Sequence, residues 1–411
     1  MKILYVSQYF PPEMGAPAAR AYEFARRWVS FGHDVTVLTT FPNHPTGVIH
    51  DGYRGRRFLR ERPEGIKVVR TFIYAAPNRG ILRRSLNYLS FMLSATTQGA
   101  WATDRPDLII ATSPQFLCAM AGFFLSRLKR RPFVFEVRDL WPDSIVAVGA
   151  LPEGHWGVRI LRRLERFLYR NSDAIVIVSE AFRPEIVLRG GRTEKIHVVT
   201  NGADVGLFRP PADNEKLKRS FGLEGKFVAS FAGTLGMAHG LDTVLQAAAR
   251  LSSSTDIVFW LVGEGARKEE LKRAAEARGL TNVLFQGQVP RERVPDVLGA
   301  SDVSLVLLRK TDLFRTVIPS KMFEAMAVAR PIILGVDGQA RKIVEEAGAG
   351  VVIEPESSGE LAEAVLRLKR DRPLAERLGK SGLAYVRRYH SHDALARRYL
   401  EVLESVSRGV A

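Results

Sequence analysis

The sequence has almost no cysteine and no long hydrophobic run, and both absences narrow the class of protein. Only Cys118 of the 411 residues is a cysteine, which excludes a disulfide framework and a zinc site built from cysteines. The longest apolar stretch, Phe116 to Leu125, is far shorter than the roughly 20 residues of a membrane-spanning helix. The first residues, MKILYVSQYF, lack a small-residue cleavage site. We therefore expect a cytoplasmic protein.

Nucleic-acid motifs are also missing, although basic residues are in excess. The formal net charge is +16, which suits a nucleic acid, an anionic membrane or a phosphorylated substrate, or is simply a solvated basic surface. The basic residues are neither gathered in one block nor interleaved with stacking aromatics. The sequence therefore argues against a nucleic-acid partner.

The first half of the chain alternates strand-like and helix-like patterns. Helix-period segments such as Ala18–Phe31 and Gln115–Leu128 lie between several short runs rich in β-branched and aromatic residues. Strands are expected at Ile3–Val6, Val35–Leu38, Val68–Thr71, Leu108–Ala111, Phe133–Val137 and Ala174–Val178. This alternation predicts a parallel sheet with helices on both faces.

The alternation stops near Thr200 and then starts again. The segment TNGADVGLFRPPADN, with an Asn-Gly turn and a Pro-Pro pair, predicts a linker. Further strands are expected at Phe227–Ala232, Ile257–Val262, Val283–Gln286, Val303–Leu308, Ile332–Leu334 and Val351–Ile353. We predict two tandem Rossmann-like, doubly wound α/β domains, residues 1–203 and 204–390. A helix at about 391–407 is a candidate to pack back on the first domain.

Ligands of such sheets bind beyond the carboxyl ends of the strands, so functional residues are expected in the loops that follow strands. The first loop, SQYFPPEMGAPAAR, lacks the GxGxxG fingerprint of dinucleotide enzymes, but Gly15 lets a ligand approach a helix start. The segment EVRDLWPDS gathers Glu136, Arg138, Asp139 and Asp143, a set that is costly to bury without a purpose. A structural Arg–Asp pair is the alternative.

The second domain offers glycine loops and a lysine motif. In FAGTLGMAHGLDTVLQAA and LVGEGARKEEL, glycines follow a strand and precede a helix, a setting in which backbone N–H groups cradle phosphate. In VIPSKMFEAMAVARPIILG, Ser320 starts a helix, Lys321 lies in its first turn, and Glu324 shares the face of Ser320. Lys321 is suited to a diphosphate and Glu324 to ribose hydroxyls. A surface helix with solvated charges is the alternative.

Taken together, these segments resemble the retaining GT-B glycosyltransferases of family four over nearly the whole chain. The chain looks most like the WbuB-type fucosaminyl- and fucosyltransferases of O-antigen and colanic-acid assembly. The matching segments are GAPAARAYEFARRWVSFGHDVTVLTT, FPNHPTG, FEVRDLWPDS, VSEAFRPEIV, GTLGMAHGLDTVLQAA, LVGEGARKEEL and VIPSKMFEAMAVARPI. The resemblance implies a cleft between the two domains. It also implies metal-independent transfer, with retention, of a sugar from a UDP- or GDP-sugar to an acceptor hydroxyl, with no further cofactor.

The loops and the resemblance together assign roles to residues. Donor binding is expected from Gly15, Gly233, Thr234, His239, Gly240, Gly263, Glu264, Gly265, Gln288, Val289, Arg309, Ser320, Lys321 and Glu324. Arg138, Asp139 and Lys321 are the catalytic candidates, and Asn43 and His44 are the acceptor candidates.

The chain departs from the family pattern at several of these positions. Thr316 stands where many members have the first glutamate of an E-x7-E pair, and Thr234 and His239 stand where an arginine and a lysine grip the diphosphate. Lys321, and after it Arg309, are the candidates for the missing charge. A histidine of the family is replaced by Arg138, which cannot act as a base at ordinary pH, so Asp139 is a possible substitute.

Two basic helices bear on the acceptor. Arg79–Trp101 and Arg159–Arg170 combine basic residues with apolar ones, which suits an anionic membrane surface. For Arg159–Arg170, an apolar stripe that faces the core is the alternative. We expect a lipid-diphosphate-linked saccharide acceptor at the inner face of the membrane. A nucleotide-sugar 2-epimerase is the alternative enzyme on this scaffold, but the sequence shows no additional set of acid and base groups for it.

Overall fold

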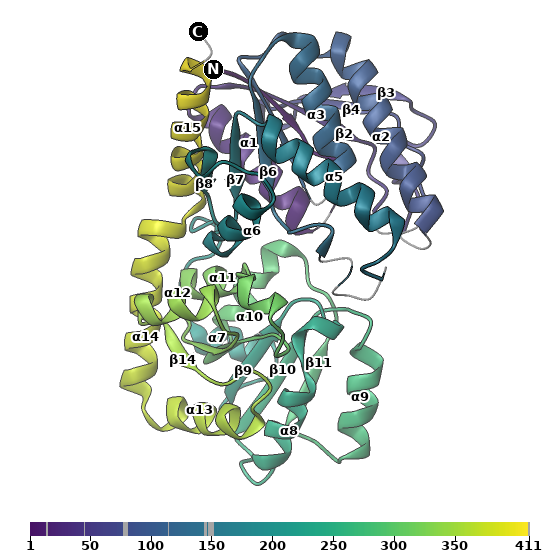
Figure 1. The fold of residues 1–411 in the computed structure, drawn as a ribbon. Helices are drawn as coiled ribbons and strands as arrows, with labels where there is room; N and C mark the ends of the chain where they lie inside the picture. Colours follow the sequence, from purple (N-terminus) through teal and green to yellow (C-terminus); the bar gives the residue numbers. More distant parts are fainter. Residues whose placement is uncertain are drawn as a thin grey trace. The chain divides into compact units, whose positions relative to one another are not determined.

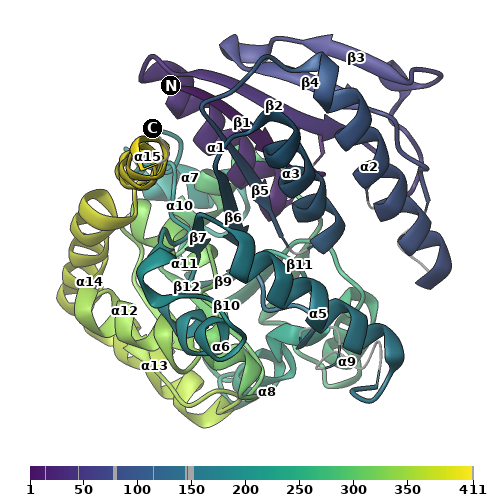
Figure 2. The ribbon, with the colours of Figure 1, turned by 45° about the horizontal axis from the view of Figure 1, so that its top comes forward.

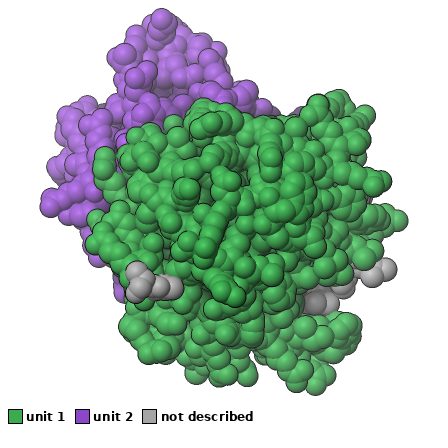
Figure 3. All heavy atoms as spheres, turned by 90° about the horizontal axis from the view of Figure 1, so that it is seen from above, with its two compact units in different colours: residues 1–200, 395–411 green, residues 201–394 purple. Residues whose placement is uncertain are grey.

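The computed structural model describes residues 1–13, 15–44, 46–76, 81–113, 115–143, 146 and 152–409. Met14, Pro45, Ser144 and the first two residues of the expected helix Arg79–Trp101 therefore lie outside the described residues. The chain divides into two compact units (Figure 3). Unit 1 comprises residues 1–200 and 395–411, and unit 2 comprises residues 201–394. Each unit is described by itself below.

Unit 1 is built on an eight-stranded sheet with the order β3-β4-β2-β1-β5-β6-β7-β8 (Figure 1). All neighbouring strands are parallel except β3, which runs antiparallel to β4. The strands are β1 (Lys2–Val6), β2 (Asp34–Thr40), β3 (Phe58–Glu61), β4 (Lys67–Thr71), β5 (Leu108–Thr112), β6 (Phe133–Val137), β7 (Ala174–Ile177) and β8 (Ile196–Val198). The edge strands β3 and β8 were not predicted, because they are short and only partly apolar.

Helices cover both faces of this sheet, because successive side chains of a strand point to opposite faces. Ile3 and Tyr5 of β1 belong to one apolar cluster, and Leu4 and Val6 belong to another. Helices α1 and α15 pack on the first face, and α2, α3 and α5 lie side by side on the second (Figure 2). The helices are α1 (Ala16–Ser30), α2 (Ile81–Ala102), α3 (Phe116–Lys129), α5 (Trp156–Asn171), α6 (Arg183–Leu188) and α15 (His392–Arg408).

The end of the chain is part of the unit 1 core. Residues from Leu395 onward belong to this unit, and the indole of Trp28 on α1 donates a hydrogen bond to the carbonyl of Ala396 at 3.2 Å. The Trp28 ring stacks on Phe24 and meets the ring of Tyr399 edge-on at 5.3 Å. Aromatic packing therefore fixes the last helix on α1.

Unit 2 is a six-stranded parallel sheet with the order β11-β10-β9-β12-β13-β14. This is the Rossmann order of doubly wound folds. The strands are β9 (Phe227–Ala232), β10 (Ile257–Val262), β11 (Val283–Gln286), β12 (Val303–Leu307), β13 (Ile332–Gly335) and β14 (Gly350–Val352). The helices are α7 (Asn214–Ser220), α8 (Asp242–Arg250), α9 (Lys268–Ala277), α10 (Val294–Gly299), α11 (Lys321–Ala327), α12 (Gln339–Ala347), α13 (Ser358–Arg370) and α14 (Arg372–Tyr385). The predicted fold class is confirmed.

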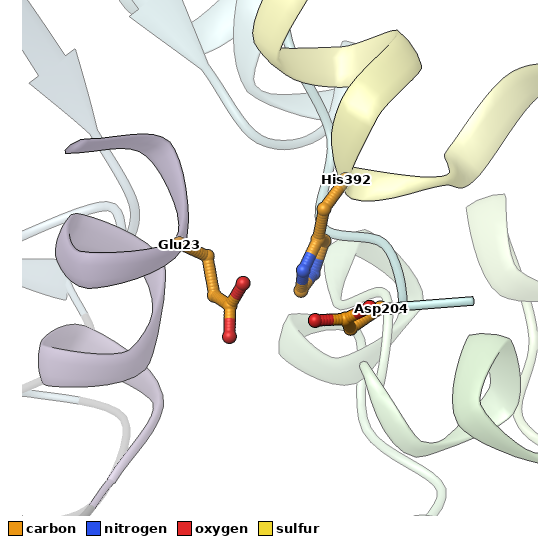
Figure 4. Close-up of side chains that lie close together, drawn as sticks. All are labelled: Glu23, Asp204 and His392. Atoms are coloured by element: carbon orange, nitrogen blue, oxygen red, sulfur yellow. The ribbon is translucent and has the colours of Figure 1, made fainter. Parts of the chain in front are cut away.

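Unit 2 begins in the predicted linker, which pairs with the segment after α14. Ala203 forms a parallel bridge with Ser391, and the backbone N–H of His392 donates to the carbonyl of Ala203 at 2.9 Å. Figure 4 shows the side chains of Asp204 and His392 directed toward one another beside this bridge. Glu23, which is also drawn there, lies on α1 and belongs to unit 1. The linker is therefore held by backbone pairing within unit 2.

A buried carboxylate joins several elements of unit 1. Glu136 at the end of β6 is completely buried, and it accepts hydrogen bonds from the Tyr5 hydroxyl at 2.6 Å and from Nε of Arg20 at 3.0 Å. Arg20 also donates to the carbonyls of Val199 and Thr200 at 2.7 and 2.8 Å. Burial alone raises the pKa of Glu136, but the nearby guanidinium groups and hydrogen bonds outweigh it and lower that pKa. This network links β1, α1, β6 and the segment after β8.

We expect Glu136→Gln to destabilise unit 1 by about 3–5 kcal/mol, because breaking a buried ion pair leaves its partner charge uncompensated. The measurement is the unfolding midpoint in urea, followed by the fluorescence of the tryptophans. Asp51→Asn is the control, since the Asp51 carboxylate of the pair with Arg54 is 89% exposed, and it should leave the midpoint unchanged. Equal midpoints for Glu136→Gln and the wild type would contradict the central role of this carboxylate.

Candidate active site

The predicted residues of unit 1 lie in neighbouring loops at the carboxyl edge of its sheet. The backbone N–H of Arg138, after β6, donates to Oγ of Ser113, after β5, at 2.8 Å. Nε2 of Gln115 donates to the Tyr9 hydroxyl at 2.7 Å, which links the loops after β5 and β1. The ring of Tyr9 meets the ring of His44, after β2, at 5.1 Å. A continuous row of contacts therefore runs through these loops in the spatial order of the strands.

The two acceptor candidates are held by a carboxylate that the sequence analysis did not single out. Oε1 of Glu13 accepts the backbone N–H groups of Asn43 at 2.8 Å and of His44 at 2.9 Å. The side-chain amide of Asn43 donates to the carbonyl of Phe41, so it also braces its own loop. Burial lowers the pKa of His44, so its imidazole is neutral at physiological pH. Glu13 belongs to no recognisable motif. The only hint of its function in the sequence is the presence of an acidic residue in a proline-rich loop.

The four ionisable residues at the end of β6 and in the loop after it have different partners. Glu136 belongs to the buried network, and Asp143 pairs with Arg189, which also binds Glu165 at 2.9 Å. The structural alternative considered from the sequence therefore applies to these two carboxylates. Arg138 and Asp139 remain the candidates for chemistry. Burial lowers the pKa of Arg138 while the charge of Glu136 opposes that effect, and an arginine stays cationic at neutral pH.

Gly15 is the residue before α1, where the chain turns into the helix. Its φ of 134° lies in the region that favours glycine, so a side chain at this position would strain the turn. The residue is exposed. The structure thus explains a glycine here by backbone geometry, and a ligand can reach the start of α1.

The glycine loops of unit 2 lie backbone against backbone. Leu235 N–H donates to the carbonyl of Glu264 at 2.8 Å, and a Cβ at Gly263 would overlap with the carbonyl oxygen of Gly233. A Cβ at Gly265 would likewise overlap with the carbonyl of Leu235. The loops after β9 and β10 can approach this closely only because these glycines have no side chains.

Lys321 places a buried ammonium group beside these loops. Its Nζ lies 3.6 Å from the centroid of the Phe231 ring and 2.9 Å from the position that a Cβ of Gly233 would occupy. The Nζ is buried and forms no hydrogen bond with any residue that the structure describes. Burial lowers the pKa of Lys321 to about 7. A buried ammonium that lies against an aromatic ring and has no hydrogen-bond partner among the described residues favours an anionic ligand.

His239 does not supply a second cation in this loop. Its Nδ1 lies 3.1 Å from the carbonyl oxygen of Leu307, and its ring meets Phe231 edge-on at 5.2 Å. Burial and the charge of Lys321 lower the pKa of His239 to about 4, so the ring is neutral at pH 7. Gly240 has a left-handed φ of 55°, and α8 begins two residues later at Asp242.

Arg309 lies beside this loop with an acid that the sequence analysis missed. Nε of Arg309 is 3.8 Å from the carboxylate of Glu356, which also accepts the backbone N–H of Lys310 at 2.9 Å. Both side chains lie 3.5 Å from the position of a Cβ on Gly240. Glu356 follows β14 in a left-handed conformation and belongs to no motif, so only the fold brings it here.

Glu324 lies on α11 with Lys321, as predicted. Its carboxylate is 3.8 Å from Nη1 of Arg291, and burial raises its pKa while Arg291 and Lys321 oppose that effect. Of the other donor candidates, Val289 packs against the apolar cluster that contains Trp260. Thr234, Gln288, Ser320 and Glu264 are exposed, and Glu264 pairs with Lys268 at 2.6 Å.

Comparison with known families covers both halves of the chain. Residues 15–202 match the glycosyl transferase 4-like domain, and residues 213–384 match the glycosyl transferases group 1. The chain is a GT-B glycosyltransferase of the group 1, family-four-like kind. Its two sheets and the carboxyl-edge loops described above therefore belong to a sugar-transferring enzyme.

Similar proteins support this assignment. The putative colanic acid biosynthesis glycosyl transferase WcaI of Escherichia coli K12 is 27% identical over 370 residues, which cover 87% of this chain and 89% of WcaI. The probable glycosyltransferase WbjE of Pseudomonas aeruginosa is 26% identical over 264 residues, 64% of this chain and 63% of WbjE. The structure of Anabaena HepE in complex with UDP and glucose has a TM-score of 0.73 at 21% identity, over 98% of this chain and 100% of HepE.

The lengths and apolarity of the helices show whether any of them could span a bilayer. Within the described ranges, no helix combines the length and apolarity that crossing a bilayer requires.

The buried Lys321 should make the stability of this glycosyltransferase depend on pH. Its pKa is about 7 in the folded state and about 10.4 in an unfolded chain, so between these values the unfolded state binds more protons. Stability contributed by this residue therefore rises with pH across that window, by at most about 1.4 kcal/mol per pH unit. Lys321→Met removes this dependence. Denaturant midpoints of both proteins between pH 6 and about 9.5 measure it, and parallel curves would contradict the burial of a titrating ammonium.

Proposed function

We propose that this glycosyltransferase transfers a sugar from a UDP- or GDP-sugar to an acceptor hydroxyl, with retention and without a metal ion. One observation carries the proposal: the buried ammonium of Lys321, which lacks a hydrogen-bond partner among the described residues, lies at the carboxyl edge of the unit 2 sheet. Doubly wound folds bind nucleotides at this edge. A diphosphate supplies the anionic oxygens that such a cation needs. The UDP in the HepE structure agrees with this donor class.

The donor would be held by unit 2 through three kinds of contact. Lys321 faces the diphosphate together with backbone N–H groups of the loop after β9, whose glycines let a ligand approach closely. Glu324, one turn along α11, accepts hydrogen bonds from the ribose hydroxyls. Arg309 is the second cation that can reach the leaving group, since it lies beside Gly240.

The proposed reaction does not require a protein side chain as the base. When the bond between the sugar and the diphosphate breaks, negative charge develops on the leaving oxygen, and fixed cations stabilise it. In a front-face reaction with retention, that oxygen takes the proton of the attacking acceptor hydroxyl. This agrees with the residues of unit 1, where Arg138 stays a cation and Asp139 is the single candidate base of its loop.

We further propose a lipid-diphosphate-linked saccharide as the acceptor, in WbuB-type synthesis of a surface polysaccharide. The name of WcaI refers to colanic acid biosynthesis, which is of this kind. Exposed apolar side chains form a stripe on α2, with Leu86, Leu89 and Leu93 between 40% and 54% exposed. On α5, Trp156 is 65% exposed next to a stripe of exposed arginines, Arg159, Arg163, Arg166 and Arg170. Such a surface suits an anionic membrane.

The rival enzyme on this scaffold, a nucleotide-sugar 2-epimerase, gains no support. WcaI and WbjE are both named as glycosyltransferases, and the described loops add no set of acids and bases beyond the residues already assigned.

Thermal shift with nucleoside diphosphates tests the donor site. A ligand that binds only the folded state raises the melting temperature, so UDP or GDP should stabilise the wild type, and Glu324→Ala should lose most of that shift. Glu276→Ala is the matched control, since it removes an exposed glutamate from α9 of the same unit. An undiminished shift in Glu324→Ala would move the ribose site elsewhere, and no shift with either nucleotide would overturn the donor proposal.

Co-sedimentation with liposomes tests the membrane proposal. Each arginine near an anionic surface contributes about 1 kcal/mol, so the double variant Arg163→Gln/Arg166→Gln should bind phosphatidylserine vesicles about 30-fold more weakly at low salt. The control Arg219→Gln/Arg273→Gln removes two exposed arginines from helices of unit 2. Equal sedimentation of the two variants, or no binding of the wild type, would contradict the membrane proposal.

A further inference from the structure

A small polar hollow lies at the carboxyl edge of the unit 1 sheet. It is lined by Gln8, Tyr9, Asn43, His44, Ala76, Arg84, Asn87 and Tyr88. These residues come from the loops after β1, β2 and β4 and from the first half of α2. The free volume is about 20 Å³, enough for one group of the size of a water molecule. A whole sugar ring does not fit, but a single substituent does.

Hydrogen bonds fix the walls of the hollow. Nε2 of Gln8 donates to Oδ1 of Asn87 at 2.9 Å, and Nδ2 of Asn87 donates to the carbonyl of Tyr74 at 2.8 Å. The Tyr9 hydroxyl accepts from Gln115. Gln8 and Asn87 are buried, so these amides cannot turn without losing their partners. The hollow is therefore a rigid feature of unit 1.

The charge of the hollow is positive, because Arg84 has no counter-ion in the described part of the chain. Its Nε is buried without a hydrogen bond, and it forms no ion pair with a described residue. Two buried arginines of unit 1 do have counter-ions: Arg20 binds Glu136 at 3.0 Å, and Arg70 binds Glu61 at 2.6 Å. A guanidinium that is partly withdrawn from water needs an anionic or hydrogen-bonding partner.

No acidic side chain among the lining residues satisfies Arg84. Glu13, a carboxylate in the loop after β1, is bound by backbone N–H groups of the loop after β2 and is not among the lining residues. His44 is neutral because burial lowers its pKa. The remaining lining residues carry no formal charge. One positive charge therefore governs what the hollow prefers.

We infer that the hollow receives one oxygen of a compact oxyanion of the acceptor, a carboxylate or a phosphate group, with Arg84 as its cationic contact. This inference rests on the proposed function, in which unit 1 binds the acceptor. That oxygen enters the hollow. The rest of the oxyanion and of the acceptor stays outside it. In a lipid-linked saccharide the oxyanion has two sources: an acidic sugar and the lipid diphosphate. Arg84 is thus a specificity-determining residue, which distinguishes a charged acceptor from a neutral one.

The experiment measures binding of small probes to the full chain by isothermal titration, with UDP or GDP present at saturation so that unit 2 is filled. The probes are methyl glucuronide, methyl glucoside as its neutral counterpart, and farnesyl diphosphate. We expect one anionic probe to bind at least tenfold more tightly than methyl glucoside, and which one does so identifies the source of the oxyanion. Arg84→Gln should remove that preference. Arg83→Gln, which changes the exposed neighbouring arginine, should keep it.

Two further measurements keep the result interpretable. Arg84→Lys keeps the positive charge and should retain most of the preference, even if Arg84→Gln lowers the melting temperature. The thermal shift with nucleotide should be the same in all three variants as in the wild type. The absence of a shift in the wild type would overturn the donor proposal alone. Equal binding of all probes by the wild type, or an Arg84→Gln variant that keeps the preference, would overturn the inference about the hollow while leaving the donor site intact.

Discussion

The close approach of two backbones in unit 2 is the constraint on which the candidate donor site depends. The loops after β9 and β10 touch at Gly233 and Gly263, where a Cβ on Gly263 would overlap with the carbonyl oxygen of Gly233. The ammonium of Lys321 lies against the ring of Phe231, 2.9 Å from the position that a Cβ of Gly233 would occupy. A glycine at position 233 therefore leaves space beside the buried ammonium, whose pKa is lowered by burial.

The distribution of charge around this site follows from the same packing. His239 lies between Phe231 and the end of β12 and is neutral, so the buried positive charge beside the loop after β9 comes from Lys321, which belongs to another segment. A single buried cation can change its protonation when an anion arrives, since its pKa lies near neutrality. An exposed arginine and lysine in the loop itself would both stay charged at neutral pH.

Much of the fold could be predicted, because strands buried on both faces are continuous apolar runs. The bounds of β6, β9, β10 and β11 agree with the sequence expectation. The edge strands β3 and β8 escaped, since a short strand with polar residues has no clear pattern.

The candidate site was predictable where a motif is local and unpredictable where partners are distant. Lys321 and Glu324 stand in one helical turn, and their proximity follows from spacing alone. The pairing of Glu136 with Arg20 joins residues far apart in the sequence, so the sequence could not show that this carboxylate serves the core. Arg84 belongs to none of the loop motifs. The observation that singles it out, a buried Nε without a hydrogen-bond partner among the described residues, depends on the fold.

The path of the chain has a consequence for how the protein is made. Unit 1 includes the residues from Leu395 onward, and the ring of Tyr399 packs on Trp28. During synthesis the amino-terminal half leaves the ribosome first, yet part of its core arrives with the last helix. Unit 2, which is continuous in sequence, has all its residues before unit 1 does. The half that emerges first is therefore the half whose core is completed last, and until then the face of α1 that carries Trp28 lacks its partner helix.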